Sequence, residues 1–237
     1  MSPTAPDDAA GPEVGGVNGK VVLVAGATSA AGLAAIRALV AAGARVVAVG
    51  RDAAKLEPLA AEGAETETCD LTDESAVGAL ADRVHERFGP VDGVLHLVGG
   101  WRGGGGLAGQ TEADYRFLEG SFTALRHVSR AFDADLKDSD ASRLAVVSST
   151  AVARPLAGGA NYAAVKAATE AWARAVAQGF AKSARDAGRP LAAASVVFRV
   201  KSLDGLEDAL AQRFADLWRS DAADVNDTIV ELTDPSL

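Results

Sequence analysis

Short runs of apolar residues, each long enough for one strand, alternate along the chain with longer segments of helical periodicity. The first run, KVVLVAG, is almost continuously apolar, as are the central runs that follow it. Strands that are buried on both faces of a sheet show this pattern, because neither face needs polar residues. The candidate strands occupy residues 20–26, 44–50, 64–70, 91–99, 142–149, 191–198 and 227–232.

The intervals between these runs carry apolar residues at helical spacing. The candidate helices occupy residues 31–43, 53–62, 73–88, 111–134, 159–187 and 204–219. Strands that alternate with helices are typical of βαβ units and a parallel sheet. We therefore predict one α/β domain over residues 18–237, a three-layer, doubly wound Rossmann fold with about seven parallel strands. Residues 1–17 lack such periodicity, and we expect them to form a flexible tail.

Composition and charge exclude several classes of function. The chain has 237 residues and a net charge of -9, which argues against a nucleic-acid or anionic membrane partner. Its start has no signal-peptide pattern, and its longest uncharged stretch, residues 21–36, is too short to span a bilayer. Cys69 is the only cysteine, which fits a reducing cytoplasm. No cluster of His, Cys and carboxylate residues has metal-ligand spacing, so we expect no metal.

A loop of small residues, AGATSAAG at 25–32, joins the first predicted strand to the first helix. Small residues let the backbone approach a phosphate, and a helix N-terminus offers free N–H groups and a positive dipole end. A tight turn without a ligand would give the same composition. Its position on the first strand of a βαβ series favours a nucleotide-binding loop.

The end of the second predicted strand bears on the choice of nucleotide. A free ribose 2′-hydroxyl usually meets an acidic residue there, whereas a 2′-phosphate prefers an arginine. This chain has Gly50 followed by Arg51, so the sequence favours NADP(H), with NAD(H) still possible. In the alternative interpretation Arg51 is a solvated side chain that pairs with Asp52.

A serine, a tyrosine and a lysine follow the fifth predicted strand in the pattern S-x12-Y-x3-K. They are Ser149, Tyr162 and Lys166. Residues four apart share one face of a helix, so the phenol and the ammonium are expected to be neighbours. A solubilising surface pair would satisfy the spacing alone. A lysine cation this close should lower the tyrosine pKa from its usual value of about 10, which suits acid–base chemistry.

In these motifs the chain resembles the short-chain dehydrogenase/reductase family, of the compact type, from Lys20 almost to the C-terminus. The first-turn pattern of that family, T-G-x-x-x-G-x-G, appears with alanine at two of its four positions, 25 and 30. CDLTD at 69–73 matches the segment whose aspartate binds adenine in relatives. HLVGG at 96–100 keeps the glycine of the family's N-N-A-G motif and lacks its asparagines.

The resemblance implies a hydride transfer between NADP(H) and a carbonyl or alcohol substrate. Tyr162 would act as the general acid/base, Ser149 would orient the substrate oxygen, and Lys166 would also hold the nicotinamide ribose. The expected catalytic residues are Ser149, Tyr162, Lys166 and Ser121. The expected cofactor-binding residues are Gly26, Thr28, Ser29, Ala31, Gly32, Arg51, Asp70, Leu71, Gly99, Tyr162 and Lys166.

The chain departs from the family at three places. Ser121 stands where many relatives have an asparagine that supports a water-linked proton relay to the lysine. Phe198 and Arg199 replace the usual Pro-Gly after the sixth strand. In the glycine-rich loop 99–109, Trp101 and Arg102 either reach into the substrate pocket or belong to a surface loop.

These departures leave other functions open. The chain can instead be a family member without redox activity that binds cofactor or regulates, or a dehydratase or cyclase of secondary metabolism. Relatives pair through their long helices, so the resemblance also implies a homo-oligomer, a dimer or a tetramer.

Overall fold

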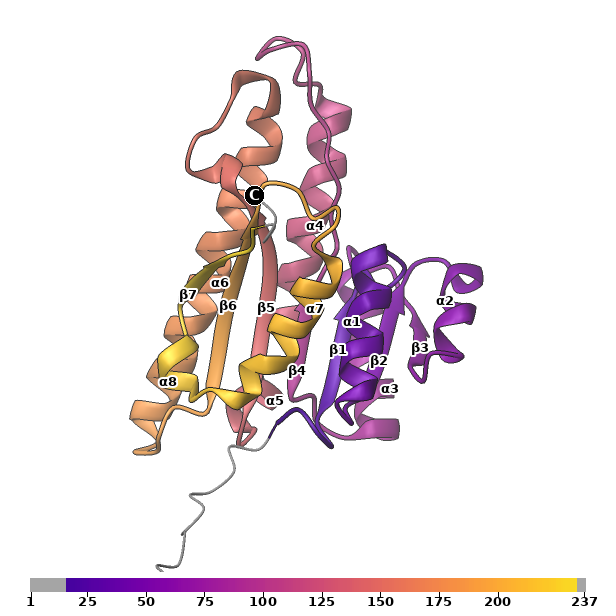
Figure 1. The fold of residues 1–237 in the computed structure, drawn as a ribbon, viewed down its shortest axis with the longest axis vertical. Coiled ribbons are helices and arrows are strands. Elements are labelled where there is room, and N and C mark those ends of the chain that lie inside the picture. Colours follow the sequence, from indigo (N-terminus) through magenta and orange to yellow (C-terminus); the bar gives the residue numbers. More distant parts are fainter. Residues whose placement is uncertain (1–15, 234–237) are drawn as a thin grey trace, which may run out of the picture.

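Seven parallel strands form the central sheet of the protein in this computed structural model, which describes residues 16–233 (Figure 1). Their order in the sheet is β3-β2-β1-β4-β5-β6-β7. Strands β2 and β3 are added on one side of β1, and strands β4 to β7 on its other side, so the strand order reverses between the neighbours β1 and β4. The predicted fold class is confirmed. The strands are β1 (Val21–Ala25), β2 (Arg45–Gly50), β3 (Glu65–Thr68), β4 (Gly93–His96), β5 (Ser142–Ser149), β6 (Ala193–Val200) and β7 (Thr228–Glu231).

Helices cover both faces of the sheet. The helices are α1 (Ala30–Ala41), α2 (Ala53–Ala60), α3 (Glu74–Phe88), α4 (Glu112–Ala131), α5 (Asp133–Asp138), α6 (Ala160–Asp186), α7 (Glu207–Asp216) and α8 (Ala222–Val225). Buried residues of α1 and α7 belong to the core on one face, and those of α3, α4 and α6 to the core on the other. In β1, Val22 faces the first core and Leu23 the second, which explains its continuous apolar run.

Several element boundaries differ from the predicted ones. β4 ends at His96 rather than at residue 99, and β6 begins and ends two residues later than predicted. The predicted helix 111–134 is interrupted at Phe132, which is the C-cap of α4 and the N-cap of α5. β6 extends because its ladder with β5 continues until Val200 pairs with Ser149.

The predicted tail, residues 1–17, lies outside the described residues except for Gly16 and Val17. Val17 is buried against the core of α1 and α7, and its carbonyl accepts a hydrogen bond from the backbone N–H of Lys20. This part of the predicted tail therefore packs with the domain. Between residues 16 and 233, no helix combines the length and apolarity that crossing a membrane requires.

We predict that Gly32→Ala lowers the free energy of unfolding by roughly 1–3 kcal/mol, because it overpacks the contact between α1 and the preceding loop. A Cβ added at Gly32 would lie 2.1 Å from the carbonyl oxygen of Ala27. Urea denaturation followed by circular dichroism measures the change. The matched control is Gly78→Ala in α3, where an added Cβ meets nothing within 4 Å. It should stabilise the helix by roughly 0.5–1 kcal/mol. Equal stability of Gly32→Ala and the wild type would contradict the packing argument.

Candidate active site

The turn between β1 and α1 brings backbone groups to the carboxyl edge of the sheet. Gly26 has φ +83°, and an added Cβ there would lie 2.8 Å from the backbone nitrogen of Val98. The Ser29 hydroxyl accepts a hydrogen bond from the N–H of Gly32 and donates to the carbonyl of Gly26, both at 3.1 Å. The close packing of this turn therefore requires Gly26 and Gly32, the two glycines of the family pattern that this chain keeps.

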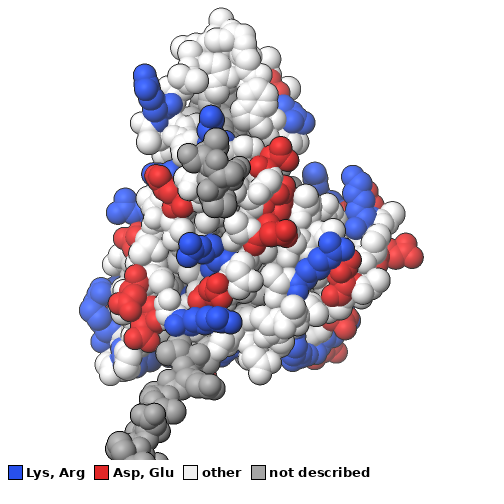
Figure 2. Space-filling view, in the orientation of Figure 1, with Lys and Arg blue, Asp and Glu red and all other residues white. Residues whose placement is uncertain are grey.

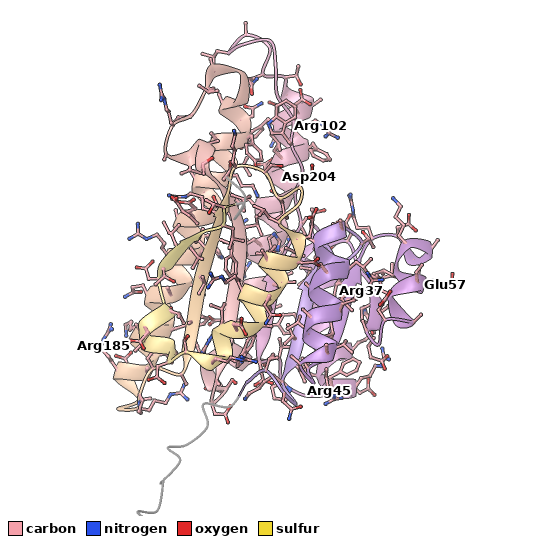
Figure 3. All side chains as sticks on the ribbon, in the orientation of Figure 1. Arg37, Arg45, Glu57, Arg102, Arg185 and Asp204 are labelled. Carbon is pink, nitrogen blue, oxygen red and sulfur yellow. The ribbon has the colours of Figure 1, made fainter. Side chains whose placement is uncertain are left out.

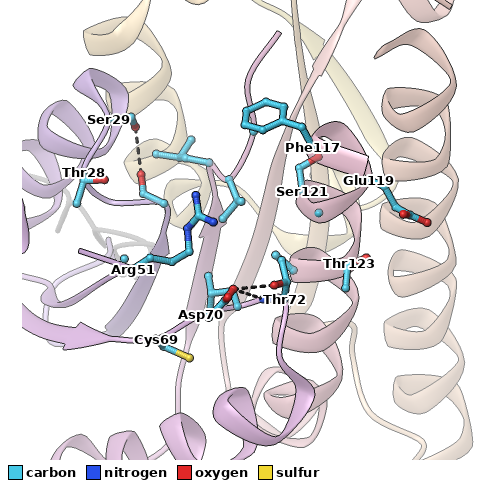
Figure 4. Close-up of a pocket in the computed structure, with 18 of the residues that line it drawn as sticks. Thr28, Ser29, Arg51, Cys69, Asp70, Thr72, Phe117, Glu119, Ser121 and Thr123 are labelled. Atoms are coloured by element: carbon cyan, nitrogen blue, oxygen red, sulfur yellow. Dashed lines mark hydrogen bonds between the residues drawn. The ribbon is translucent and has the colours of Figure 1, made fainter. Parts of the chain in front are cut away.

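A first cavity of about 520 Å³ opens beside this turn, between the ends of β1 to β4 and helix α4 (Figure 4). Seven of the predicted cofactor-binding residues line it: Gly26, Thr28, Ser29, Arg51, Asp70, Leu71 and Gly99. The strand order reverses at this point, between β1 and β4, where ligands of open α/β sheets usually bind.

Arg51 and Asp70 are two of the four charged residues that line the first cavity, with Arg116 and Glu119. Asp70 accepts hydrogen bonds from Thr72, at 2.7 Å from the hydroxyl and 3.0 Å from the backbone N–H, and these bonds hold its pKa below the usual range. The Arg51 charge lowers that pKa further. The alternative partner considered for Arg51, Asp52, instead caps α2 by accepting from the backbone N–H of Ala54. Arg51 extends into the space between Ser29 and Asp70 (Figure 4).

A second cavity of about 300 Å³ lies on the other side of the turn. Tyr162 and Lys166 line it, together with Ser29 and Ala31 from the start of α1. The two cavities share Ser29 and residues 97–99, so they adjoin along the segment that follows β4.

Ser149, Tyr162 and Lys166 come together where β5 meets α6. Ser149 is the last residue of β5, and its hydroxyl is near enough to Tyr162, in the first turn of α6, to act on the pKa of that phenol. One turn later, the Lys166 Nζ donates to the carbonyl of Val147 at 2.7 Å and lies 5.7 Å from the centre of the Tyr162 ring. A phenol and an ammonium thus line the second cavity, and the Ser149 hydroxyl lies beside the phenol, an arrangement suited to proton transfer with a bound oxygen atom.

The comparison with known proteins agrees with this geometry. The family model of the short chain dehydrogenases matches residues 20–184. The chain belongs to this family. It is 30% identical over 159 residues to the 2,3-dihydro-2,3-dihydroxybenzoate dehydrogenase of Bacillus subtilis (strain 168). The aligned residues cover 65% of this chain and 61% of that protein. The alignment therefore spans less than two thirds of the relative.

Solved structures share the fold over nearly the whole chain. A metagenomic short-chain oxidoreductase in complex with NADP is 26% identical, with a TM-score of 0.78, over 92% of this chain and 98% of that one. The NAD⁺-bound xylitol dehydrogenase is 18% identical, with a TM-score of 0.79, over 91% of this chain and 98% of that one. At 18% identity the likeness concerns the fold alone.

In this member of the short-chain dehydrogenase family the tyrosine pKa differs from the expectation. Burial raises the pKa of the Tyr162 hydroxyl above its ordinary value, and the hydrogen bond with Ser149 offsets only part of that rise. Burial lowers the pKa of Lys166 to about 8. The prediction that Lys166 lowers the tyrosine pKa is therefore wrong for this structure. The physical reason is that both groups leave water, and desolvation disfavours the charged form of each.

Three predicted site residues differ from the rest in their relation to the cavities. Ser121, in α4, lines the first cavity and not the second, and its hydroxyl donates to the carbonyl of Leu118 at 2.7 Å. The structure thus does not bring its side chain to Ser149, Tyr162 and Lys166. Ser149 and Gly32 line neither cavity, and Gly32 packs against the preceding loop.

The sequence interpretation missed the part of α4 that faces the first cavity. This wall consists of Arg116, Phe117, Glu119, Gly120, Thr123 and Ala124. Their spacing of three and four residues is a helical signal that could have indicated a common face. Residues 200–203, at and after the end of β6, also line the second cavity.

The glycine-rich loop 99–109 lies beside residues 150–160 in a projection beyond the end of the sheet (Figure 1). Gln110 joins the two segments, because its amide nitrogen donates to the carbonyls of Gly104 and Gly158, both at 3.0 Å. Figure 2 shows few charged side chains on this projection. Trp101 is 61% exposed, and the Arg102 guanidinium lies 3.9 Å from the ring centre of Phe117 (Figure 3). Neither Trp101 nor Arg102 lines the two cavities, so the surface-loop alternative describes them better.

We predict that Lys166 titrates near pH 8, because its burial disfavours the ammonium form. As the pH rises through about 8, the side chain loses its positive charge. NMR of the protein with ¹³C-labelled lysine measures this titration, and the resonance missing in Lys166→Met identifies the residue. Titration at the ordinary lysine value of about 10.4 would contradict the prediction.

Proposed function

We propose that the protein is an oxidoreductase that transfers a hydride between NADP(H) and a carbonyl or alcohol substrate. The observation that carries the proposal is the placement of Tyr162 and Lys166 on the wall of the second cavity, with Ser149 beside Tyr162, and the position of this cavity next to the larger first cavity, which Arg51 lines. Membership of the short-chain dehydrogenase family and the likeness to an oxidoreductase in complex with NADP support it.

The residues present fit a dinucleotide. The absence of a Cβ at Gly26 keeps the turn close to the segment after β4, and Ser29, at the N-terminus of α1, lies in the shared part of the two cavities, where a helix N-terminus favours an anion. The first cavity would hold the adenosine half beside Asp70, and the second the nicotinamide half beside Lys166. The cofactor supplies the hydride chemistry when bound.

The side chains have separate tasks in this proposal. Tyr162 donates its proton to the oxygen of the substrate during reduction, and the Ser149 hydroxyl holds that oxygen in place. Lys166 holds the nicotinamide ribose and supplies positive charge. Arg51 pairs with the 2′-phosphate, because a guanidinium binds phosphate oxygens in a bidentate manner.

We also propose a homo-oligomer, a dimer or tetramer, as the resemblance implies, in a cytoplasmic setting. The small-molecule substrate belongs to the class of carbonyl compounds or alcohols. The Bacillus relative is named for a dihydroxylated cyclic acid, so cyclic alcohols and ketones are the first substrates to screen.

Tyr162→Phe should lower kcat by roughly 10²–10⁴-fold, because the general acid is lost. The dissociation constant of NADPH, measured by nucleotide fluorescence, should stay nearly the same. Tyr115→Phe is the matched control, since Tyr115 lies in α4 and its hydroxyl contacts Glu119 at 3.4 Å, away from the second cavity. Turnover of Tyr162→Phe at the native rate would remove tyrosine from the proposed mechanism.

Arg51→Ala should weaken NADPH binding roughly tenfold or more and NADH binding much less, because a charge-assisted contact to the 2′-phosphate is lost. Titrations of both nucleotides against wild type and variant give the ratio. Arg185→Ala, at the far end of α6, is the control for a change in net charge (Figure 3). Equal losses for both nucleotides would refute the assignment of Arg51. Failure of the wild type to bind either nucleotide would favour the alternative of a family member without redox activity.

A further inference from the structure

Glu170 is a buried carboxylate without a task in the proposed reaction. It lies in α6, one turn after Lys166, and is 7% exposed. One of its oxygens accepts from the Ser148 hydroxyl at 2.7 Å and from the Arg199 Nε at 3.1 Å, and the other accepts from the Arg199 Nη2 at 2.8 Å. The carboxylate thus binds a hydroxyl and a guanidinium that come from two different strands.

The two donors are neighbours in the sheet. In the parallel ladder between β5 and β6, Ser148 pairs with Arg199. Side chains alternate between the two faces of a strand. Phe198 belongs to the core of α1 and α7, so Arg199 lies on the other face, which α6 covers. A single carboxylate of α6 therefore bonds to the ends of both strands.

The strand end that reaches Glu170 exists because Phe198 and Arg199 stand where relatives carry Pro-Gly. A proline has no N–H for a ladder, and a glycine has no side chain that could bind a carboxylate. In this chain β6 continues to Val200, and Arg199 donates to Glu170. The replacement thus bonds the end of β6 to the helix that carries Tyr162.

Stability alone does not account for this ion pair. Two charges lose their hydration when they are buried, so a buried ion pair is often no more stable than two apolar residues of similar size. Such a pair can instead specify one arrangement, because a displaced helix would leave a buried charge without its partner. The strand residues on either side of Ser148 serve the site: the carbonyl of residue 147 accepts from Lys166, and Ser149 lies beside Tyr162. A displacement of α6 along β5 would change all of these contacts together.

We propose that Glu170 and Arg199 are positioning residues for the side chains of the candidate active site. Their ion pair fixes α6 against the ends of β5 and β6, and so holds Tyr162 and Lys166 in place. Neither Glu170 nor Arg199 lines the two cavities, so both act through the side chains that they position. Their effect on turnover rests on the proposed function, whereas the placement of the two side chains does not.

The double variant Glu170→Met/Arg199→Met separates positioning from stability. It removes both charges, so urea denaturation should give a stability near that of the wild type. NMR of the nucleotide-free, full-length protein with ¹³C-labelled lysine and tyrosine then reports on the site. A helix that is held less tightly admits water, so the pKa of Lys166 should rise above about 8 and that of Tyr162 should fall towards its ordinary value of about 10. Wild-type titration of both groups in the double variant would overturn the proposal.

Glu170→Gln is an isosteric second variant, which tests the ion pair without a change in volume. Arg199 keeps the carboxylate of Glu231 in β7 at 3.7 Å, so its charge is not left alone. The titrations of Lys166 and Tyr162 should shift in the same directions as in the double variant, and wild-type values would again overturn the proposal. The matched control is Arg174→Met, which removes an exposed ion pair of the same helix, with Asp227 at 3.1 Å, and should leave both titrations unchanged.

Kinetics connects the placement to the reaction. With a cyclic ketone that the wild type reduces, the double variant should lower kcat roughly tenfold or more with a smaller change in KM, because displaced groups lose contacts made in the transition state. The NMR readouts require no turnover. A protein with the shifted titrations but no redox activity would therefore refute the proposed function and leave the positioning role intact, whereas an active protein with unshifted titrations would do the reverse.

Discussion

The contact between the end of β5 and one face of α6 is the constraint on which the candidate site depends. Two consecutive strand residues, 147 and 148, each form a hydrogen bond of 2.7 Å with one helix residue, through a backbone carbonyl and a serine hydroxyl, and the hydroxyl of residue 149 acts on the pKa of a third helix residue. The helix residues are four apart, so they form one stripe along α6. They are Lys166, Glu170 and Tyr162. The phenol and the ammonium owe their positions to this stripe rather than to the loops around the cavity.

The same contact gives a role to Arg199, one of the two residues that replace the Pro-Gly of relatives after the sixth strand. Arg199 donates to the buried carboxylate of Glu170 at 2.8 Å, and Glu170 in turn accepts from Ser148. A buried charge must be paired, and this pairing joins β5, β6 and α6. Because Arg199 sits within a strand that continues to Val200, β6 ends two residues later than predicted, and residues 200–203 line the second cavity. The departure from the family is therefore a local structural replacement.

Sequence periodicity was sufficient for the architecture, because continuous apolar runs between helical patterns allow few arrangements other than a covered parallel sheet. Spacing was also sufficient to place Tyr162 and Lys166 on one helix face. It was not sufficient for the protonation of Tyr162, since burial depends on residues far along the chain. Nor did it reveal the α4 wall of the first cavity or the ion pair of Glu170 with Arg199, because both arise from packing between elements that are separate in sequence.

Burial acts in opposite directions on the two groups that matter most for proton transfer. It raises the pKa of Tyr162, so the phenol is protonated at neutral pH. It lowers the pKa of Lys166 to about 8, which is only slightly above neutral pH, so the ammonium form predominates by a small margin. The Val147 carbonyl favours the charged lysine without adding a negative charge. A carboxylate in its place would neutralise the cation that the proposed cofactor needs. A neutral acceptor thus preserves the positive charge of a site in a protein whose net charge is -9.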